Sequence, residues 1–192
     1  MKDYRKWLPA DGYEGSASVG GSFYSRNIAD YYFTPWDLGY GQFVRFDHDF
    51  IGRDALEEMA ADPPRTKVTL ALENDDVLGA IGSQFEQGGR AKFMEFPSAV
   101  YSMHPYDAVL ANGDAIGIST WIGYSSNERR MLTLAVLNKE YARPGTEVTL
   151  LWGEEGGGTR KLNVEPHAQC EIRAIVSPVP YSKVARESYR AD

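Results

Sequence analysis

Short runs rich in apolar and β-branched residues recur along the chain after residue 66, and polar turn residues separate them. Such runs are typical of strands. They predict strands at 67–72, 108–110, 115–124, 130–137, 147–152, 161–164 and 169–176. Short strands at this spacing favour an antiparallel barrel or jelly roll over a parallel sheet.

Turn residues between the predicted strands support this interpretation. Asn112-Gly113-Asp114 is a strong hairpin signal, because asparagine and glycine tolerate a positive φ. Arg143-Pro144-Gly145-Thr146 predicts a second turn, and Gly156-Gly157-Gly158 predicts a flexible hairpin tip. No helix start follows these glycines, so we do not expect them to cradle a phosphate. The predicted fold class is mainly β (α+β overall), with an antiparallel Greek-key or jelly-roll-like barrel.

The part of the chain before residue 63 has a different pattern. Residues 1–33 are rich in turn signals and show little apolar periodicity. Residues 38–46 alternate loosely and predict a strand that ends in the turn Asp47-His48-Asp49. A helix is expected at 53–61, and Asp62-Pro63-Pro64 ends it, since proline disfavours helix in the residue before it.

The two consecutive prolines mark the predicted boundary between two units. The leading unit comprises residues 1–62, and the second unit comprises residues 63–192. Within the second unit a short helix is expected at 75–85, with Asn74 as its N-cap. All the predicted barrel strands fall in this second unit.

Composition and charge exclude several classes of protein. The 192 residues are 43% hydrophobic and 24% charged, and no apolar run approaches the roughly 20 residues that cross a bilayer. A net charge of −7 argues against a nucleic-acid binder, which needs a basic surface. The single cysteine, Cys170, excludes an internal disulfide framework and is compatible with a reducing cytoplasm. We therefore expect a soluble cytoplasmic protein that contacts neither nucleic acid nor membrane.

Several motifs, in order along the chain, resemble the glycine cleavage T-protein (aminomethyltransferase) superfamily. That family has a T-P-x-E-x-G-L segment, a D-F-x-G-[KR]-x-A-L segment, a G-x-x-x-G-x-x-T-S hairpin and a proline-aromatic ending. Two departures from the family pattern are Asp37, where glutamate is usual, and Tyr124-Ser125-Ser126-Asn127, which lacks the usual proline. The matching segments here are Thr34-Pro35-Trp36-Asp37-Leu38-Gly39, Asp49-Phe50-Ile51-Gly52-Arg53-Asp54-Ala55-Leu56, Gly113-Asp114-Ala115-Ile116-Gly117-Ile118-Ser119-Thr120 and Pro178-Val179-Pro180-Tyr181-Ser182-Lys183.

Within this superfamily the chain is most similar to the tetrahydrofolate-dependent aryl O-demethylases, which act on vanillate, syringate or 3-O-methylgallate. The resemblance rests on segments such as Asp11-Gly12-Tyr13-Glu14, Gly20-Gly21-Ser22-Phe23, Asn27-Ile28-Ala29-Asp30-Tyr31-Tyr32 and Trp152-Gly153-Glu154. It implies a methyl transfer from an aromatic methoxyl group to N5 of tetrahydrofolate. It also implies that residues 1–62 are the tail of the folate-binding domain and that residues 63–192 are the carboxyl-terminal β-barrel.

Such a carboxyl-terminal portion would be inactive alone, because the family's amino-terminal domains make most of the cofactor and substrate contacts. The implied partners are folate and a methoxy-aromatic molecule in the complete enzyme, together with a missing amino-terminal half or a second copy of the chain. Two alternatives stay open. The chain could be a non-catalytic barrel subunit or assembly module that pairs with a separate catalytic half. It could instead be a fragment of an aminomethyltransferase like the T-protein.

The resemblance also implies which residues could take part in the reaction. Demethylation of an aryl ether needs a proton donor near the departing phenolate oxygen, and tyrosine can supply that proton. Tyr24 is the catalytic candidate, because it matches the tyrosine of the family's L-Y-G segment, whereas Tyr31 and Tyr32 suit core positions equally well. The alternative for each of the three tyrosines is a partly buried core residue with a satisfied hydroxyl.

The glutamyl carboxylates of folate call for arginine or lysine at the mouth of the site. Arg45, Lys183 and Arg186 are the candidates, and the alternative for each is an ordinary surface charge. Asp37 is expected to cap its turn. The three histidines lie far apart in the sequence without ligand spacing, so no metal site is predicted. His48 should form local hydrogen bonds, and Cys170 should be a small apolar core residue.

Overall fold

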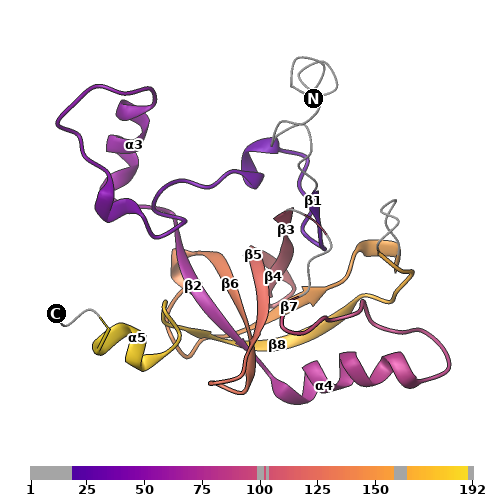
Figure 1. Ribbon diagram of the computed structural model, residues 1–192. Coiled ribbons are helices and arrows are strands. Elements are labelled where there is room, and N and C mark those ends of the chain that lie inside the picture. The colour runs from indigo at the N-terminus through magenta and orange to yellow at the C-terminus, as the bar shows by residue number, and fades with distance from the viewer. Residues whose placement is uncertain (1–18, 99–101, 103, 158–163, 190–192) are drawn as a thin grey trace, which may run out of the picture.

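The computed structural model describes residues 19–98, 102, 104–157 and 164–189. Within these residues six strands close into a barrel, and every hydrogen-bonded pair of its strands is antiparallel (Figure 1). The predicted antiparallel barrel is confirmed. In order around the barrel the strands are β2 (Arg65–Leu72), β6 (Arg130–Asn138), β5 (Asp114–Ser125), β4 (Asp107–Ala111), β7 (Glu147–Trp152) and β8 (Cys170–Ser177).

The strand connections form a Greek key. Strands β4, β5 and β6 follow one another as hairpins, and β7 then returns to pair with β4. The β4–β5 hairpin turns at Asn112 and Gly113, whose φ angles of 53° and 87° are those that the Asn-Gly signal predicts. β8 pairs with both β7 and β2, which closes the barrel. A closed barrel leaves no free strand edge for another chain to extend.

The barrel interior is the core of the molecule. In the first part of β6 alternate residues point inward, so Met131, Thr133 and Ala135 are buried while Arg130, Leu132 and Leu134 are partly exposed. Removing such side chains from water supplies the main driving force for folding. The described hydrophobic residues with 0% exposure come from five of the six strands: Leu70, Leu72, Val109, Leu137, Leu150 and Ile172.

The helix that follows β2 packs against the barrel. Helix α4 (Asn74–Gly82) packs on β8 and β6 through Val77 and Ala80, and a 3-10 turn, η3 (Ser83–Phe85), extends it. The predicted helix at 75–85 is confirmed, but its N-cap is Glu73, because Asn74 already lies in the first turn. Helix α5 (Lys183–Glu187) follows the last strand. None of the described helices is long and apolar enough to cross a membrane.

The segment before the barrel, residues 24–62, is here called the arm, and Figure 1 shows it extending away from the barrel. It contains η1 (Ile28–Tyr31), η2 (Gly41–Phe43) and α3 (Arg53–Ala60), so the helix predicted at 53–61 is confirmed. The strand predicted at 38–46 is wrong. There the backbone amides bond to carbonyls three to five residues earlier, as in Leu38 to Thr34 and Tyr40 to Pro35, because no neighbouring strand offers partners.

The remaining short elements are the parallel bridge between β1 (Val19–Gly20) and β3 (His104–Pro105), and the 3-10 turns η4 (Lys139–Tyr141) and η5 (Glu155–Gly157). Apart from Val164, the strand predicted at 161–164 lies outside the described residues. Gly158 of the predicted glycine-rich tip does so too. The assignment of residues 1–62 to the tail of a folate-binding domain stays a prediction.

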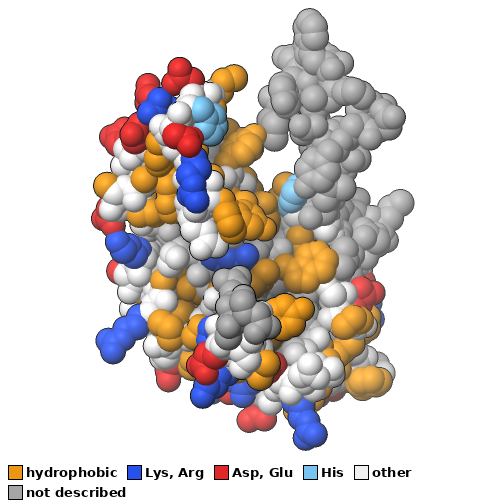
Figure 2. All heavy atoms as spheres, turned by 60° about the vertical axis from the view of Figure 1, so that its left-hand side comes forward, with side chains coloured by type: hydrophobic (Ala, Val, Ile, Leu, Met, Phe, Trp, Pro, Cys, Tyr) orange, Lys and Arg blue, Asp and Glu red, His pale blue; other side chains and the backbone are white. Residues whose placement is uncertain are grey.

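Apolar side chains remain at the surface of the arm. Helix α3 buries none of its residues completely. Figure 2 shows apolar side chains standing at the surface of the face turned toward the viewer. In the arm the exposed large apolar residues are Tyr24, Ile28, Tyr32, Leu38, Tyr40, Phe43 and Ile51. So many exposed apolar side chains in one short segment are typical of a surface that another protein part covers.

Candidate functional site

A cavity of about 550 Å³ lies where the start of the arm meets the barrel. Its wall combines residues of the arm with residues of β5 and the beginning of β2. Tyr24 is among the lining residues, which are Phe23, Tyr24, Ser25, Ala29, Asp30, Pro64, Arg65, Ala115, Ile116, Gly117, Ile118 and Asn138. We take this cavity as the candidate functional site, because it is the place where a sequence-predicted catalytic side chain borders a hollow.

The three tyrosines of the arm differ in their surroundings. Tyr31 is structural, since its hydroxyl accepts a hydrogen bond from the Ser25 amide at 2.9 Å and its ring contacts Phe23 edge to face. Tyr24 is 77% exposed and borders the cavity. Tyr32 is 67% exposed but is not among the residues that line it. Of these three tyrosines Tyr24 is thus both exposed and at the cavity, and its catalytic role stays a prediction.

The three predicted folate-binding cations lie in two parts of the chain, Arg45 in the arm and both Lys183 and Arg186 on α5. Arg45 is exposed in the arm and donates to the carbonyls of Gln42 and Val44 at 2.8 and 3.3 Å. Lys183 is exposed on α5, where its amine lies 3.7 Å from Glu187. Arg186 donates to the carbonyl of Pro180 at 2.7 Å and to that of Tyr181. Within the described residues no hydrogen bond or ion pair joins these side chains to one another or to Tyr24.

Asp37 caps its turn and also ties the arm to the barrel. Its carboxylate accepts from the Thr34 amide at 2.9 Å, and its own amide donates to the Thr34 hydroxyl at 3.3 Å. The same carboxylate, almost completely buried, accepts from the Arg65 guanidinium at 2.6 Å. Arg65 also donates to the carbonyl of Tyr32 at 3.0 Å and lies over the Phe33 ring. The aspartate thus does more than the predicted turn cap.

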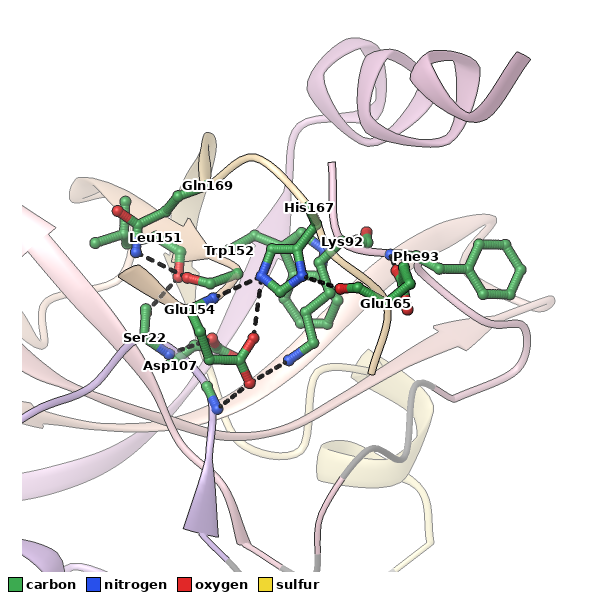
Figure 3. A network of polar contacts seen from close by, with 12 residues as sticks. Ser22, Lys92, Phe93, Asp107, Leu151, Trp152, Glu154, Glu165, His167 and Gln169 are labelled. Carbon is green, nitrogen blue, oxygen red and sulfur yellow. Dashed lines mark hydrogen bonds and ion pairs between the residues drawn. The ribbon is translucent and has the colours of Figure 1, made fainter. Parts of the chain in front are cut away.

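Beside the first residues of the chain that the structure describes lies a buried polar network that sequence patterns did not indicate (Figure 3). The Lys92 amine, only 1% exposed, lies 3.0 Å from Glu154 Oε1 and 5.1 Å from the centre of the Trp152 ring. The Trp152 indole donates to the Lys92 carbonyl at 2.8 Å. The other charged member of the network is Asp107, at the start of β4, which is 2% exposed. Lysine is rarely buried this deeply unless it is paired.

His167 completes the network on the far side of Glu154. Its Nδ1 lies 2.8 Å from the Glu165 carbonyl, so Nδ1 carries the donated proton. Its Nε2 accepts the Glu154 amide at 2.9 Å and lies 3.1 Å from Glu154 Oε2. These partners select the neutral imidazole with the proton on Nδ1. In this state Glu154 Oε2 has no hydrogen-bond donor among the described residues.

The two buried carboxylates have opposite pKa shifts. Burial raises the pKa of Asp107 from 3.8 to about 6, although the charge of Lys92 and the Ser22 amide oppose the change. Burial also acts to raise the pKa of Glu154, but the Gly21 amide and the Lys92 charge together hold it below the ordinary value. Glu154 therefore forms the ion pair with Lys92, and Asp107 is the carboxylate whose ionisation the fold opposes.

Asp107 makes the stability of the fold depend on pH. Because its pKa is higher in the folded state than in the unfolded state, its contribution to stability is complete below pH 3.8 and is lost as the pH rises through about 6. Asp107→Asn keeps an oxygen for the Ser22 amide and removes the titration. We expect the free energy of unfolding of this variant, relative to the native chain, to rise by up to about 3 kcal/mol between pH 4 and pH 8. Urea titrations at the two pH values measure this difference, and a constant difference would contradict the assignment.

The remaining candidate residues have local roles. His48 Nδ1 lies 2.8 Å from the carboxylate of the adjacent Asp47, as the acidic turn predicts. Cys170 is partly buried at the start of β8, and burial raises the pKa of its thiol to about 11, so it is a poor nucleophile. No group of three or more His, Cys, Asp or Glu side chains within the described part of the chain is placed to hold a metal ion.

Comparison with known proteins supplies the family. No family model matches the chain. The chain is 59% identical to syringate O-demethylase of Sphingobium sp. (strain NBRC 103272 / SYK-6) over 97% of its own length and 40% of that protein. It is 36% identical to sesamin methylene transferase of Sinomonas sp. (strain No.22), over 77% of this chain and 33% of the relative. An aminomethyltransferase of Streptomyces avermitilis is 32% identical over 59% of this chain and 25% of that protein.

The chain thus spans about two fifths of the length of syringate O-demethylase, the most extensive of these three matches. The resemblance derived from the Thr34-Pro35-Trp36-Asp37 and Gly113-Asp114-Ala115-Ile116 motifs is confirmed, including its O-demethylase branch. The chain belongs to the glycine cleavage T-protein (aminomethyltransferase) superfamily and corresponds to a carboxyl-terminal portion of such a protein, with syringate O-demethylase as a near relative.

Proposed function

We propose that this chain is the carboxyl-terminal part of a tetrahydrofolate-dependent methyltransferase that O-demethylates lignin-derived methoxy-aromatic compounds. The observation that carries the proposal is the 59% identity to syringate O-demethylase, which extends over 97% of the chain. Relatives that share more than half of their residues over such a length usually keep the same reaction, while the substrate can change with a few contacts. The barrel and the arm would then complete a site whose other walls come from the remaining part of the enzyme.

In this reaction the methyl group leaves the aromatic oxygen, and tetrahydrofolate supplies N5 as the methyl acceptor. The residue of this chain proposed to take part is Tyr24, as the donor of a proton to the departing phenolate oxygen. A phenol donor suits this task, because protonation converts a poor leaving group into a neutral phenol. The exposed hydroxyl at the rim of the cavity supports this role, since a ligand can reach it without displacing core side chains.

The described residues do not by themselves enclose folate. Arg45 lies in the arm, whereas Lys183 and Arg186 lie on α5, and the cavity beside Tyr24 contains none of the three. We propose that Arg45 and Lys183, whose charges remain exposed, meet the glutamyl carboxylates when the rest of the enzyme is in place. Arg186 is the weaker candidate, because its side chain is partly buried and binds two carbonyls of its own loop, whereas Arg45 also binds two carbonyls but is exposed.

The exposed apolar side chains of the arm support a missing partner. We propose that they pack against the polypeptide that corresponds to the other three fifths of the syringate O-demethylase relative. The two alternatives fit the same surface. A non-catalytic assembly module would bind that polypeptide without contributing to the reaction. An aminomethyltransferase part is favoured by weaker matches, such as the 32% identity to the Streptomyces avermitilis protein over 59% of the chain.

The decisive experiment combines this chain with a separately expressed polypeptide that corresponds to the amino-terminal three fifths of syringate O-demethylase. With tetrahydrofolate and syringate, we expect the mixture to form 5-methyltetrahydrofolate and the phenol in equal amounts, while neither part alone does so. Formation at the same rate by the amino-terminal polypeptide alone would support the assembly-module alternative. A complex that forms but transfers no methyl group from syringate or vanillate would contradict the proposed reaction.

A further inference from the structure

The residues just before Tyr24 are fixed to the end of the barrel by an unusual set of hydrogen bonds. The Gly21 amide donates to Glu154 Oε1 at 3.0 Å, and the Ser22 amide donates to Asp107 Oδ1 at 2.9 Å. The Ser22 hydroxyl donates to the Leu151 carbonyl at 2.5 Å and accepts from the Ala108 amide at 2.9 Å. Two consecutive backbone amides thus bind buried carboxylates, and such charge-assisted bonds are stronger than amide–carbonyl bonds.

Backbone bonds to Tyr106 continue the same attachment. The Phe23 amide donates to the Tyr106 carbonyl at 3.0 Å, and the Tyr106 amide donates to the Gly20 carbonyl at 2.9 Å. We call residues 20–23, with these contacts, the latch segment. It is an extra strand-like segment that lies beside the start of β4, and its side-chain partners come from the barrel.

The barrel side of the attachment is held in place independently of the latch segment. Glu154 is fixed by the Lys92 amine at 3.0 Å, and its amide is bonded to His167 at 2.9 Å. Lys92 is in turn fixed between Glu154 and the Trp152 ring. Figure 3 shows these side chains converging on the Glu154 carboxylate from different segments of the chain. The barrel therefore orients the carboxylate that accepts from the Gly21 amide. Functional sites are commonly held in place by such supporting residues.

Gly21 allows the latch segment to lie close to the barrel. Its φ of +91° is one that side-chain-bearing residues rarely adopt, and a Cβ atom there would come 2.2 Å from the Tyr106 carbonyl oxygen. A residue larger than glycine would therefore move the segment away from both carboxylates. This close approach explains why a glycine stands at position 21 of the Gly20-Gly21-Ser22-Phe23 motif, one of the segments that resemble those of the O-demethylases.

Tyr24 follows the last residue of the latch segment and makes no hydrogen bond of its own among the described residues. Its place is set by its neighbours along the chain, which are the latch segment before it and Ser25 after it, whose amide donates to the Tyr31 hydroxyl at 2.9 Å. We propose that Glu154 and Asp107 are positioning residues: through the Gly21 and Ser22 amides they hold Tyr24 at the rim of the cavity. The expected effect on catalysis rests on the proposed function, whereas the expected effect on the position of Tyr24 does not. Releasing the latch segment should free Tyr24 and Arg26 while the barrel stays folded.

A network that only stabilised the barrel would respond differently to substitution than one that positions Tyr24. If the carboxylates only stabilised the barrel, their loss would affect the latch segment and the barrel together. Gly21→Ala addresses this point, because it displaces the latch segment without removing any charge from the barrel. Gly52→Ala is its matched control, since Gly52 also has a positive φ of +88° but a Cβ atom there would meet nothing within 4 Å.

Limited trypsin digestion at Arg26, which is exposed at the surface, reports the release of the latch segment. We expect Gly21→Ala and Glu154→Ala to accelerate cleavage at Arg26 at least tenfold in the full chain. Glu154→Gln should stay within about twofold of the native chain, because the amide oxygen still accepts from Gly21. Gly52→Ala and Glu171→Ala, an exposed glutamate on β8, should leave the rate unchanged. The urea midpoint of the barrel, followed by circular dichroism, should stay close to the native value for Gly21→Ala.

Unchanged cleavage in both Gly21→Ala and Glu154→Ala would overturn the proposal. So would a loss of barrel stability in Gly21→Ala that accounts for the faster cleavage. In the reconstituted enzyme the released variants should lower kcat at least tenfold with KM within about threefold of the native value. If the native chain gives no turnover with its complementary part, the proposed function fails, but the Arg26 cleavage rates still decide whether the latch segment is held by Glu154.

Discussion

Lys92→Met is expected to lower the free energy of unfolding of the chain by about 3–5 kcal/mol, because it leaves buried carboxylates without their cation. Lys92 is 1% exposed, and its amine is the ion-pair partner of Glu154 at 3.0 Å. Methionine fills a similar volume, so the loss reports the charge rather than a cavity. A domain of ordinary stability has about 5–15 kcal/mol in total, and the variant should therefore melt roughly 10 °C lower. Urea titration at pH 7, followed by circular dichroism, measures the change.

Lys139→Met is the matched control for Lys92→Met. Lys139 also forms an ion pair, with Asp62, but the two side chains are 60% and 77% exposed. Solvent screens such a pair, so we expect its loss to cost less than about 1 kcal/mol. A Lys92→Met/Glu154→Gln double variant should recover part of the stability, since the uncompensated charge at Glu154 is removed as well. Equal losses of unfolding free energy in Lys92→Met and Lys139→Met would contradict the expectation that leaving Glu154 without its buried cation is costly.

Tyr24→Phe is expected to lower kcat of the reconstituted methyltransferase by about 10²–10⁴-fold, the usual worth of a positioned general acid. Phenylalanine keeps the ring and removes the hydroxyl, which is the group proposed to protonate the departing oxygen. KM for the methoxy-aromatic substrate should change little, because the ring contacts remain. Since Tyr24 is 77% exposed in this chain, the free energy of unfolding should also stay the same. Steady-state assays of phenol formation, with urea titration alongside, measure both quantities.

Tyr32→Phe is the control for the proton donor. Tyr32 belongs to the same part of the arm and is 67% exposed, but it does not line the cavity. Its loss should leave kcat within about threefold of the native value. Equal effects in the two variants, or a full rate for Tyr24→Phe, would remove Tyr24 from the mechanism and leave the proton to come from the other part of the enzyme.

The barrel could be predicted from the sequence because its information is local. Strands such as β7 alternate apolar and polar residues, as at Val148, Thr149 and Leu150, and turn signals such as Asn112-Gly113 mark where the chain reverses. The same local logic failed at 38–46. The alternation there is real, but a strand needs a partner, and the amides of this stretch bond to carbonyls of the preceding turn instead. Periodicity indicates which residues could form a strand, but only the tertiary structure provides the adjacent strand to which they would hydrogen-bond.

The candidate site could be predicted only in part. Tyr24 follows from the family motif, and the structure places it beside a cavity. Lys92, Asp107, Glu154 and His167 were missed as a group, because they come from distant parts of the chain and meet only when the barrel closes. One signal was available: Lys92 stands within the mostly apolar run Ala91-Lys92-Phe93-Met94, where a lysine has few ways to reach water. Such an isolated cation between apolar residues indicates a buried partner of opposite charge.

The incomplete burial of α3 has a consequence for any spectroscopic study of this chain. Because this helix buries little apolar surface, its unfolding should be only weakly coupled to the unfolding of the closed barrel. The tryptophans of the described residues divide between the two regions, with Trp36 in the arm and Trp121 and Trp152 in the barrel. A single emission trace therefore adds transitions of different steepness. Replacing both Trp36 and Trp7, which lies outside the described residues, by phenylalanine is the simplest way to record the barrel by itself.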